Sequence, residues 1–140
     1  MRTLRLLLVA LALASFAWTA RASSGTNFSD QWWNPNESGW GLNVIQHPSQ
    51  VIFAVWFTYA SSGKPTWFVL PSGTWTSSNT YSGTLYATTG SAANAPFNAA
   101  ALQVTPVGTG TFTFSDANNG TWSYSVNGVS GSRAITRQSF

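Results

Sequence analysis

The sequence predicts an all-β fold, and within that class a small antiparallel barrel in preference to a sandwich. Short segments rich in β-branched and aromatic residues recur along the chain, separated by clusters of Gly, Pro, Asn and Ser. No long helical pattern follows the N-terminal segment. About seven or eight strands joined by short turns favour an antiparallel meander. Closing the meander into a barrel removes edge strands, which this chain hardly protects with lysine.

The N-terminal segment predicts a cleavable export signal. Arg2 and Arg5 give it a positive start, an apolar run follows, and Ala20-Arg21-Ala22 is a small-x-small cleavage site. The apolar run is shorter than the roughly 20 residues of a membrane-spanning helix, which argues against the alternative of an uncleaved anchor. We therefore expect a signal peptide over 1–22, a single domain over 23–140, and a location in the periplasm or outside the cell.

Cleavage changes what the charge of the chain implies. The whole chain has six Lys and Arg against three Asp and Glu, with a sequence pI near 9.8. Three of the six cations precede residue 23, so the exported domain carries three charges of each sign and is neutral. Nucleic-acid binding needs clustered Lys and Arg, so nucleic acid is not an expected partner. The chain has no cysteine, so the domain must fold without disulfides.

The first half of the domain contains three expected strands. Asn34-Pro35-Asn36 marks a turn before a strand over 39–46 with alternating apolar residues. The strongest strand signal is the run 51–59, which is almost entirely β-branched or aromatic. Its apolar residues occupy both faces, which predicts a central strand covered on both sides or one lining an apolar cavity. A third strand is expected over 66–70, running back beside the run 51–59.

The second half continues the pattern. A strand is expected over 80–89, followed by a long loop over 90–101 with a short helical turn near 99–102. Further strands are expected over 109–115, 121–126 and 130–138. Asn127-Gly128 separates the last two of these strands, and this dipeptide is the strongest short-range signal for a hairpin.

Several motifs occur together over nearly the whole domain. They are Trp32-Trp33-Asn34-Pro35-Asn36-Glu37-Ser38-Gly39-Trp40-Gly41, Trp56-Phe57-Thr58-Tyr59, Gly63-Lys64-Pro65-Thr66-Trp67, Phe114-Ser115-Asp116-Ala117-Asn118-Asn119-Gly120-Thr121 and Ala134-Ile135-Thr136-Arg137-Gln138. In these motifs and their spacing the chain resembles a family of uncharacterised exported proteins of Gram-negative bacteria. The resemblance implies an exported location and a bacterial origin, and it implies no activity.

In one detail the chain also resembles lipocalin-type (calycin) barrels, in which a Gly-x-Trp element near the start and an Arg on the last strand close one end. Here Gly39 directly precedes Trp40, so the likeness is an analogy. It implies that Arg137 or Arg133 stacks on Trp40 in a cation–π contact. Glu37 is then expected to pair with one of these arginines or with N–H groups of its turn, and the alternative is a ligand-binding or catalytic carboxylate.

The sequence contains no familiar catalytic or metal-binding pattern. His47 is the only histidine and lies in a His-Pro-Ser turn, so a typical His and Cys metal site cannot form. Asp116 lacks the further acids of a calcium loop, which indicates turn capping. The three acids lie on separate turns and form no evident pair for glycoside hydrolysis. We expect no metal, no cofactor and no catalytic residue, and a hydrolase using Glu37 and His47 is the weakest alternative.

Tryptophan is the remaining signal, because seven of the eight tryptophans follow residue 22. Core packing is one interpretation, and an apolar or sugar-stacking surface is the other. Trp32 and Trp33 are adjacent, so in a strand they point to opposite faces. The candidate ligand-binding residues are Trp32, Trp33, Trp56, Trp67 and Tyr59.

Two functions remain open from the sequence. The first is an exported, non-catalytic barrel that binds an apolar small molecule or a glycan. The second is a structural or self-associating surface protein, because the exported domain is neutral and rich in Ser, Thr, Asn and Gly.

Overall fold

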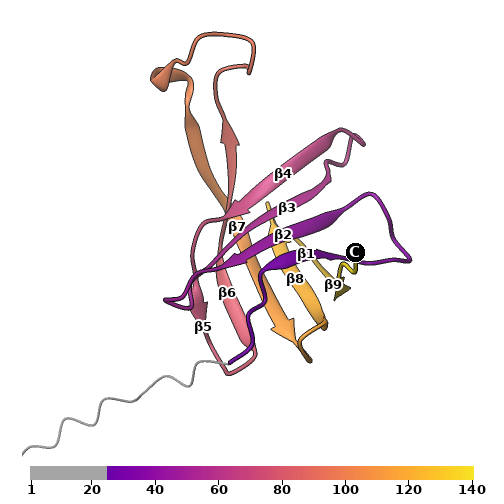
Figure 1. Cartoon of the computed structure of the whole chain (residues 1–140). Coiled ribbons are helices and arrows are strands. Elements are labelled where there is room, and N and C mark those ends of the chain that lie inside the picture. The colour runs from indigo at the N-terminus through magenta and orange to yellow at the C-terminus, as the bar shows by residue number, and fades with distance from the viewer. Residues whose placement is uncertain (1–24) are drawn as a thin grey trace, which may run out of the picture.

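The computed structural model describes residues 25–140, and this part of the chain is mostly β-sheet (Figure 1). The expected signal peptide over 1–22 lies outside the described residues. The helical structure of the described part is one short 3₁₀ helix, Ala99–Ala101 (η1), which corresponds to the helical turn expected near 99–102. None of the helical structure in residues 25–140 is long and apolar enough to cross a membrane.

The strands form one closed antiparallel sheet. In chain order they are β1 (Asp30–Trp33), β2 (Gly41–Gln46), β3 (Ile52–Tyr59), β4 (Pro65–Leu70), β5 (Thr74–Trp75), β6 (Thr80–Thr89), β7 (Gln103–Phe114), β8 (Asn119–Val126) and β9 (Val129–Arg137). β1 pairs with β9, and β4 pairs with β6 at Val69 and Tyr86, which completes an eight-stranded barrel. The two-residue β5 lies beside β6. The prediction of a small antiparallel barrel is confirmed.

Three pieces of strand have no counterpart in the sequence prediction. β1 has four residues, and only Trp32 among them is buried, so no alternation marks it. β5 has two residues, too few for any pattern. The first half of β7 contains Pro106 and exposes residues on both faces, so it does not have the profile of a strand in a barrel wall.

The outer face of β3 corrects one expectation. Ile52, Ala54 and Trp56 point into the barrel and are buried, whereas Phe53 and Phe57 lie on the outside and are exposed. Of the two alternatives expected for this strand, a central strand covered on both sides is therefore wrong, and the inner face of the strand lines the barrel interior. Because the sheet closes on itself, one face of each strand points away from the core.

Aromatic rings fill the inside of the barrel. Phe28 and Phe114 stack with their ring centroids 3.7 Å apart, and the centroids of Phe112 and Trp122 are 4.6 Å apart. The Trp122 indole lies against Gly110, where an added Cβ would collide with it. The interior is thus a packed core in which large rings alternate with positions that have no side chain.

The Asn127-Gly128 turn fixes the register of β8 and β9. The φ angles of these two residues are 50° and 83°, as a two-residue type I′ turn requires. The pairing of Val126 with Val129 across the turn continues to that of Trp122 with Arg133. The predicted hairpin is confirmed.

The β6–β7 hairpin extends well beyond the barrel wall (Figure 1). β4 pairs with β6 at Tyr86, and pairing of β7 with β8 begins at Gly108. Beyond these points the two strands pair with one another, and the loop that joins them carries η1. We call residues 87–105 the hairpin arm.

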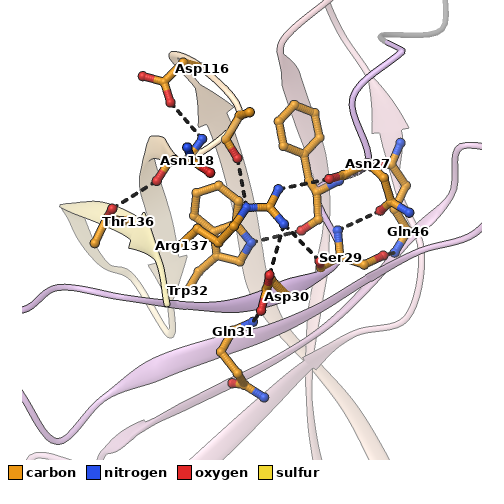
Figure 2. A network of polar contacts seen from close by, with 12 residues as sticks. Asn27, Ser29, Asp30, Gln31, Trp32, Gln46, Asp116, Asn118, Thr136 and Arg137 are labelled. Carbon is orange, nitrogen blue, oxygen red and sulfur yellow. Dashed lines mark hydrogen bonds and ion pairs between the residues drawn. The ribbon is translucent and has the colours of Figure 1, made fainter. Parts of the chain in front are cut away.

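Arg137, at the end of β9, ties the start of the described chain to the barrel (Figure 2). Its guanidinium lies 5.1 Å from the centroid of the Trp32 ring and forms an ion pair of 3.1 Å with Asp30. It also donates to three backbone carbonyls, those of Asn27, Ser29 and Ala117, at 2.9, 3.1 and 2.9 Å. One side chain thus joins the N-terminal segment, β1 and the turn between β7 and β8.

Two nearby carboxylates are held in their ionised form. The backbone N–H of Gln31 donates to Asp30 at 2.9 Å, and this contact, followed by Arg137, holds the pKa of Asp30 below its ordinary value of 3.8. Hydrogen bonds from Asn118 and Asn119 lower the pKa of Asp116 in the same way. Asp116 therefore caps the β7–β8 turn, as the sequence predicts.

Replacing Arg137 should destabilise the barrel more than replacing any other cation of the domain. We expect Arg137→Ala to lower the free energy of unfolding by about 2–4 kcal/mol, because a partly buried carboxylate and three carbonyls lose their donor. Arg137→Lys should lower the free energy of unfolding by less, because lysine keeps the positive charge. Some loss remains, because lysine lacks the planar fork of donors. Urea denaturation measures this, with Lys64→Ala as the control, since within residues 25–140 the exposed Lys64 makes no ion pair. Equal losses in Arg137→Ala and Lys64→Ala would contradict the role of Arg137.

Stability should fall in acid, partly through Asp30. Because the pKa of Asp30 is lower in the folded than in the unfolded chain, its contribution is present above the ordinary value of 3.8. That contribution is lost as the pH falls through the lower, folded pKa. We expect the urea midpoint to drop between about pH 6 and about pH 2.5, and to drop less in Asp30→Asn. An unchanged pH dependence in Asp30→Asn would exclude this carboxylate as a source.

Candidate functional site

Glu37, Trp40 and Arg133 meet at the rim of the barrel beside the β1–β2 turn. The Arg133 guanidinium lies 5.3 Å from the Trp40 ring centroid and forms an ion pair with Glu37. The Trp40 indole N–H also donates to Glu37 at 3.3 Å. A hydrogen bond with the Tyr124 side chain, and then Glu37, raise the pKa of Arg133. The structure thus places Arg133 over Trp40 and Arg137 over Trp32, and it engages Glu37 with two partners.

The two residues of the hydrolase alternative are far apart. Glu37 lies before β2 and His47 directly after it, so they are separated by about 20 Å along a six-residue strand. The His47 ring contacts the Ser49 side chain of its own turn, with Nδ1 2.7 Å from Oγ. Within residues 25–140, no three His, Asp or Glu side chains lie together as a metal site would need. The described part of the chain therefore offers no support for this alternative.

Two of the candidate ligand-binding tryptophans belong to the core. Trp32 is fully buried and donates its indole N–H to the carbonyl of Phe28 at 2.9 Å. Trp56 is 5% exposed and packs on Tyr124, with the ring centroids 4.4 Å apart. Neither ring faces solvent, so both serve to pack the barrel.

The other three candidates lie on the outside of the barrel. Trp67 on β4 and Tyr59 on β3 expose 52% and 53% of their surface, and Trp33 on β1 is partly buried. Phe57, which is 49% exposed, lies directly opposite Trp67, and Phe53 is exposed further along β3. We call Trp33, Phe57, Tyr59 and Trp67 the outer aromatic face, and Phe53 lies beyond this face on β3.

Three of these rings form a row that crosses the strands. Gly41 pairs with Phe57, and Phe57 pairs with Trp67, so the three positions lie at one level on β2, β3 and β4. Trp33 takes the adjacent place on β1, with its Cβ 3.7 Å from where a Cβ on Gly41 would be. At about 4.8 Å per strand, the row is about 14 Å long. We call these four residues the aromatic row; Gly41 leaves a gap between Trp33 and Phe57.

Two amide side chains border this gap. Gln31 and Asn43 are direct cross-strand partners on β1 and β2, two positions along from Trp33 and Gly41 and on the same outer side. Gln31 is exposed and Asn43 is partly buried. An amide can both donate and accept hydrogen bonds. The outward positions of β1 to β4 carry no Asp, Glu, Lys or Arg, so the surface combines rings and amides without charge.

A shallow pocket of about 180 Å³ lies at the other end of β2. It is lined by Gly25, Thr26, Asn27, Gln46, His47, Pro48 and Gln50. These residues supply hydrogen-bonding groups but no Phe, Tyr or Trp ring. The pocket therefore lacks the stacking surface that distinguishes the outer aromatic face.

Sequence reasoning missed Phe57, Gly41 and the amide pair. The signal that could have found them is the length of the β2–β3 turn, which pairs Gln46 with Ile52. With this register the even-numbered residues of both strands share the inner face, and the odd-numbered residues, such as Gly41 and Phe57, share the outer face. Comparison of the chain with protein-family models, curated proteins and solved structures found no match. The geometry of the described residues is therefore the basis for a function.

Proposed function

We propose that the chain is an exported, non-catalytic binding domain whose ligand contacts the outer aromatic face. The observation that carries this proposal is the pairing of Phe57 with Trp67, two large rings that are about half exposed on neighbouring strands. Both lie on the side of the sheet that faces away from the core. Contiguous exposed apolar side chains on a folded surface are typical of interaction sites. The exported location comes from the N-terminal pattern and stays a prediction.

The packed interior supports an outer site. Trp32, Phe112 and Trp122 are fully buried among other rings, so the inside of the barrel is occupied by the protein itself. A small apolar molecule usually needs a concave site that covers most of its surface. The convex outside of a barrel suits a larger ligand that makes several shallow contacts.

Removing one ring from the row should weaken binding without unfolding the domain. We expect Trp67→Ala and Phe57→Ala each to weaken binding at least about tenfold, as for central aromatic contacts in other interfaces. Two probes are used: Nile red, followed by fluorescence, and insoluble neutral polysaccharides, followed by depletion of protein from solution.

The matched control is Phe97→Ala, which removes a ring that is 81% exposed on the hairpin arm. It should leave binding unchanged. Equal effects of Phe97→Ala and Trp67→Ala, or a wild-type chain that binds neither probe, would contradict the proposal.

Self-association is a second candidate function, favoured by the hairpin arm. No charged residue occurs between Lys64 and Asp116, a stretch that includes the whole arm. Phe97, Leu102 and Val104 are exposed on it. The outer edges of its two strands make no pairing with the barrel strands, and such edges can pair with another chain. Pro106 removes one N–H from the β7 edge, which leaves the β6 edge better suited to a second copy.

Sedimentation over a wide concentration range tests this candidate. If the arms pair through β6, the mean mass of the wild type should rise with protein concentration. The mean mass of Thr89→Lys should stay at the value of a monomer, because a lysine on a strand edge opposes pairing. The control is Thr109→Lys, an exposed substitution where β7 is already paired on both sides. A wild type that is monomeric throughout would exclude self-association through the arm.

A further inference from the structure

We infer that the ligand of the outer aromatic face is an uncharged polysaccharide that crosses strands β1 to β4, with one sugar ring over Gly41. This inference rests on the proposed function and names its ligand class. Four features of the surface carry it: the spacing of the rings, the gap at Gly41, the neighbouring amides, and the absence of charge.

The aromatic row matches the apolar side of a sugar chain. A six-membered sugar ring has a face of C–H bonds that packs against a flat aromatic ring, with its hydroxyls directed outward around the edge. Trp33, Phe57 and Trp67 lie across four strands over about 14 Å, which is longer than one sugar ring. Several sugars in a chain can therefore contact the row at once.

Gly41 provides the central place in the row. Its backbone is the floor between Trp33 on one side and Phe57 on the other. Any larger residue would fill this gap, and its Cβ would also lie 3.0 Å from the Trp32 carbonyl oxygen. A ring seated here would lie between two aromatic side chains.

The amide pair lies where it can bind the hydroxyls of that sugar. Gln31 and Asn43 stand side by side at the level next to Trp33 and Gly41. A hydroxyl both donates and accepts hydrogen bonds, and so does an amide, whereas Val55 and Val69 at the same level do neither. The polar end of the row is therefore on β1 and β2, beside the gap.

The absence of charge on the outer surface favours a neutral polysaccharide over an acidic one. The outward positions of β1 to β4 have no cation. Arg133 is engaged by Glu37 and Arg137 by Asp30, and the remaining cation, Lys64, lies in the β3–β4 turn, three positions before Trp67 and outside the aromatic row. An acidic chain would bring carboxylates or sulfates to a surface without partners for them, and burying an unpaired charge is costly. A neutral chain incurs no such cost.

The direction of the chain follows from two lines of rings that meet at Phe57. One line is the aromatic row, and the other runs along β3 through Phe53 and Tyr59. The β3 line passes beside Gly41 and Asn43, but only the aromatic row crosses the gap and reaches Trp33 and Gln31 on β1. The sugar chain is therefore oriented across the strands, and Phe53 contributes little.

Depletion of protein by insoluble polysaccharides tests the inference on residues 23–140. The neutral probes are cellulose, chitin and an insoluble β-1,3-glucan, and the acidic probe is a cross-linked polygalacturonate. We expect the wild type to bind at least one neutral probe more tightly than the acidic one. Trp67→Ala and Trp33→Ala should each weaken binding at least about tenfold. Phe53→Ala should stay within about twofold of the wild type, as an energetically near-neutral neighbour does.

The Asn43→Ala variant distinguishes a sugar ligand from an apolar ligand without hydroxyls. It also provides a test of the same site if Trp33→Ala fails to fold. It should weaken polysaccharide binding by about three- to tenfold, since it removes hydrogen bonds, and leave Nile red binding unchanged. If no neutral polysaccharide binds but Trp67→Ala still weakens Nile red binding, this inference is overturned and the proposed function stands. If Trp67→Ala changes neither probe, both fail. Tighter binding to polygalacturonate than to the neutral probes overturns the inference that the ligand is neutral. A loss of binding in Phe53→Ala as large as that in Trp33→Ala overturns the inferred direction of the sugar chain.

Discussion

Closure of the sheet between β4 and β6 is the constraint on which the rest of this structure depends. The Val69–Tyr86 pairing turns a meander into a barrel, and every strand in its wall then has an inside and an outside. The interior of an eight-stranded barrel is just wide enough for side chains to fill it. Large rings such as Trp122 fit only where a partner such as Gly110 has no side chain. The residues pointing outward are released from packing and are available for another task.

The few charges of the domain are used mainly to hold the fold. Arg133 and Arg137 lie four residues apart on β9, with the buried Ile135 between them on the same inner side. Each covers a tryptophan, and each pairs with an acid from the region of β1. Four of the six charged residues in 25–140 are committed in this way. The outward positions of β1 to β4 carry rings and amides and no charged side chain.

The fold was largely predictable because its strands alternate and their turns are short. The β8–β9 hairpin is the clearest case, since Asn127-Gly128 fixes its register and places Trp122 inside. Trp32 and Trp33 also behave as their adjacency predicts, one inside and one outside. The arm was harder to predict, because the residues of β7 outside the barrel have no buried face and therefore no alternation.

The site was less predictable, because β3 is apolar on both faces and composition cannot say which face is inside. Ala54 is smaller than Phe53 or Phe57, yet it is Ala54 that lies in the core. The inner face is chosen by partners distant in sequence: Trp56 packs with Tyr124 of β8, while Phe57 has Gly41 and Trp67 as its cross-strand partners on the outer face. Hydrophobicity alone therefore cannot distinguish Trp56 from Trp67. Only the closed sheet shows that Trp56 packs in the core and that Trp67 is exposed.

The outer aromatic face and the hairpin arm lie on different parts of the barrel, and this bears on how the two candidate functions relate. The face occupies β1 to β4, whereas the arm belongs to β6 and β7, and these parts are joined by pairing only at Val69 and Tyr86. Association through the β6 edge of the arm uses no residue of the aromatic row. A dimer formed in this way would keep both rows available. A repeating ligand such as a polysaccharide would then engage two rows at once, and the second contact would form at a high effective concentration where the geometry permits it. Self-association through the β6 edge is therefore compatible with binding, so a finding of dimers would not argue against a ligand on the outer aromatic face.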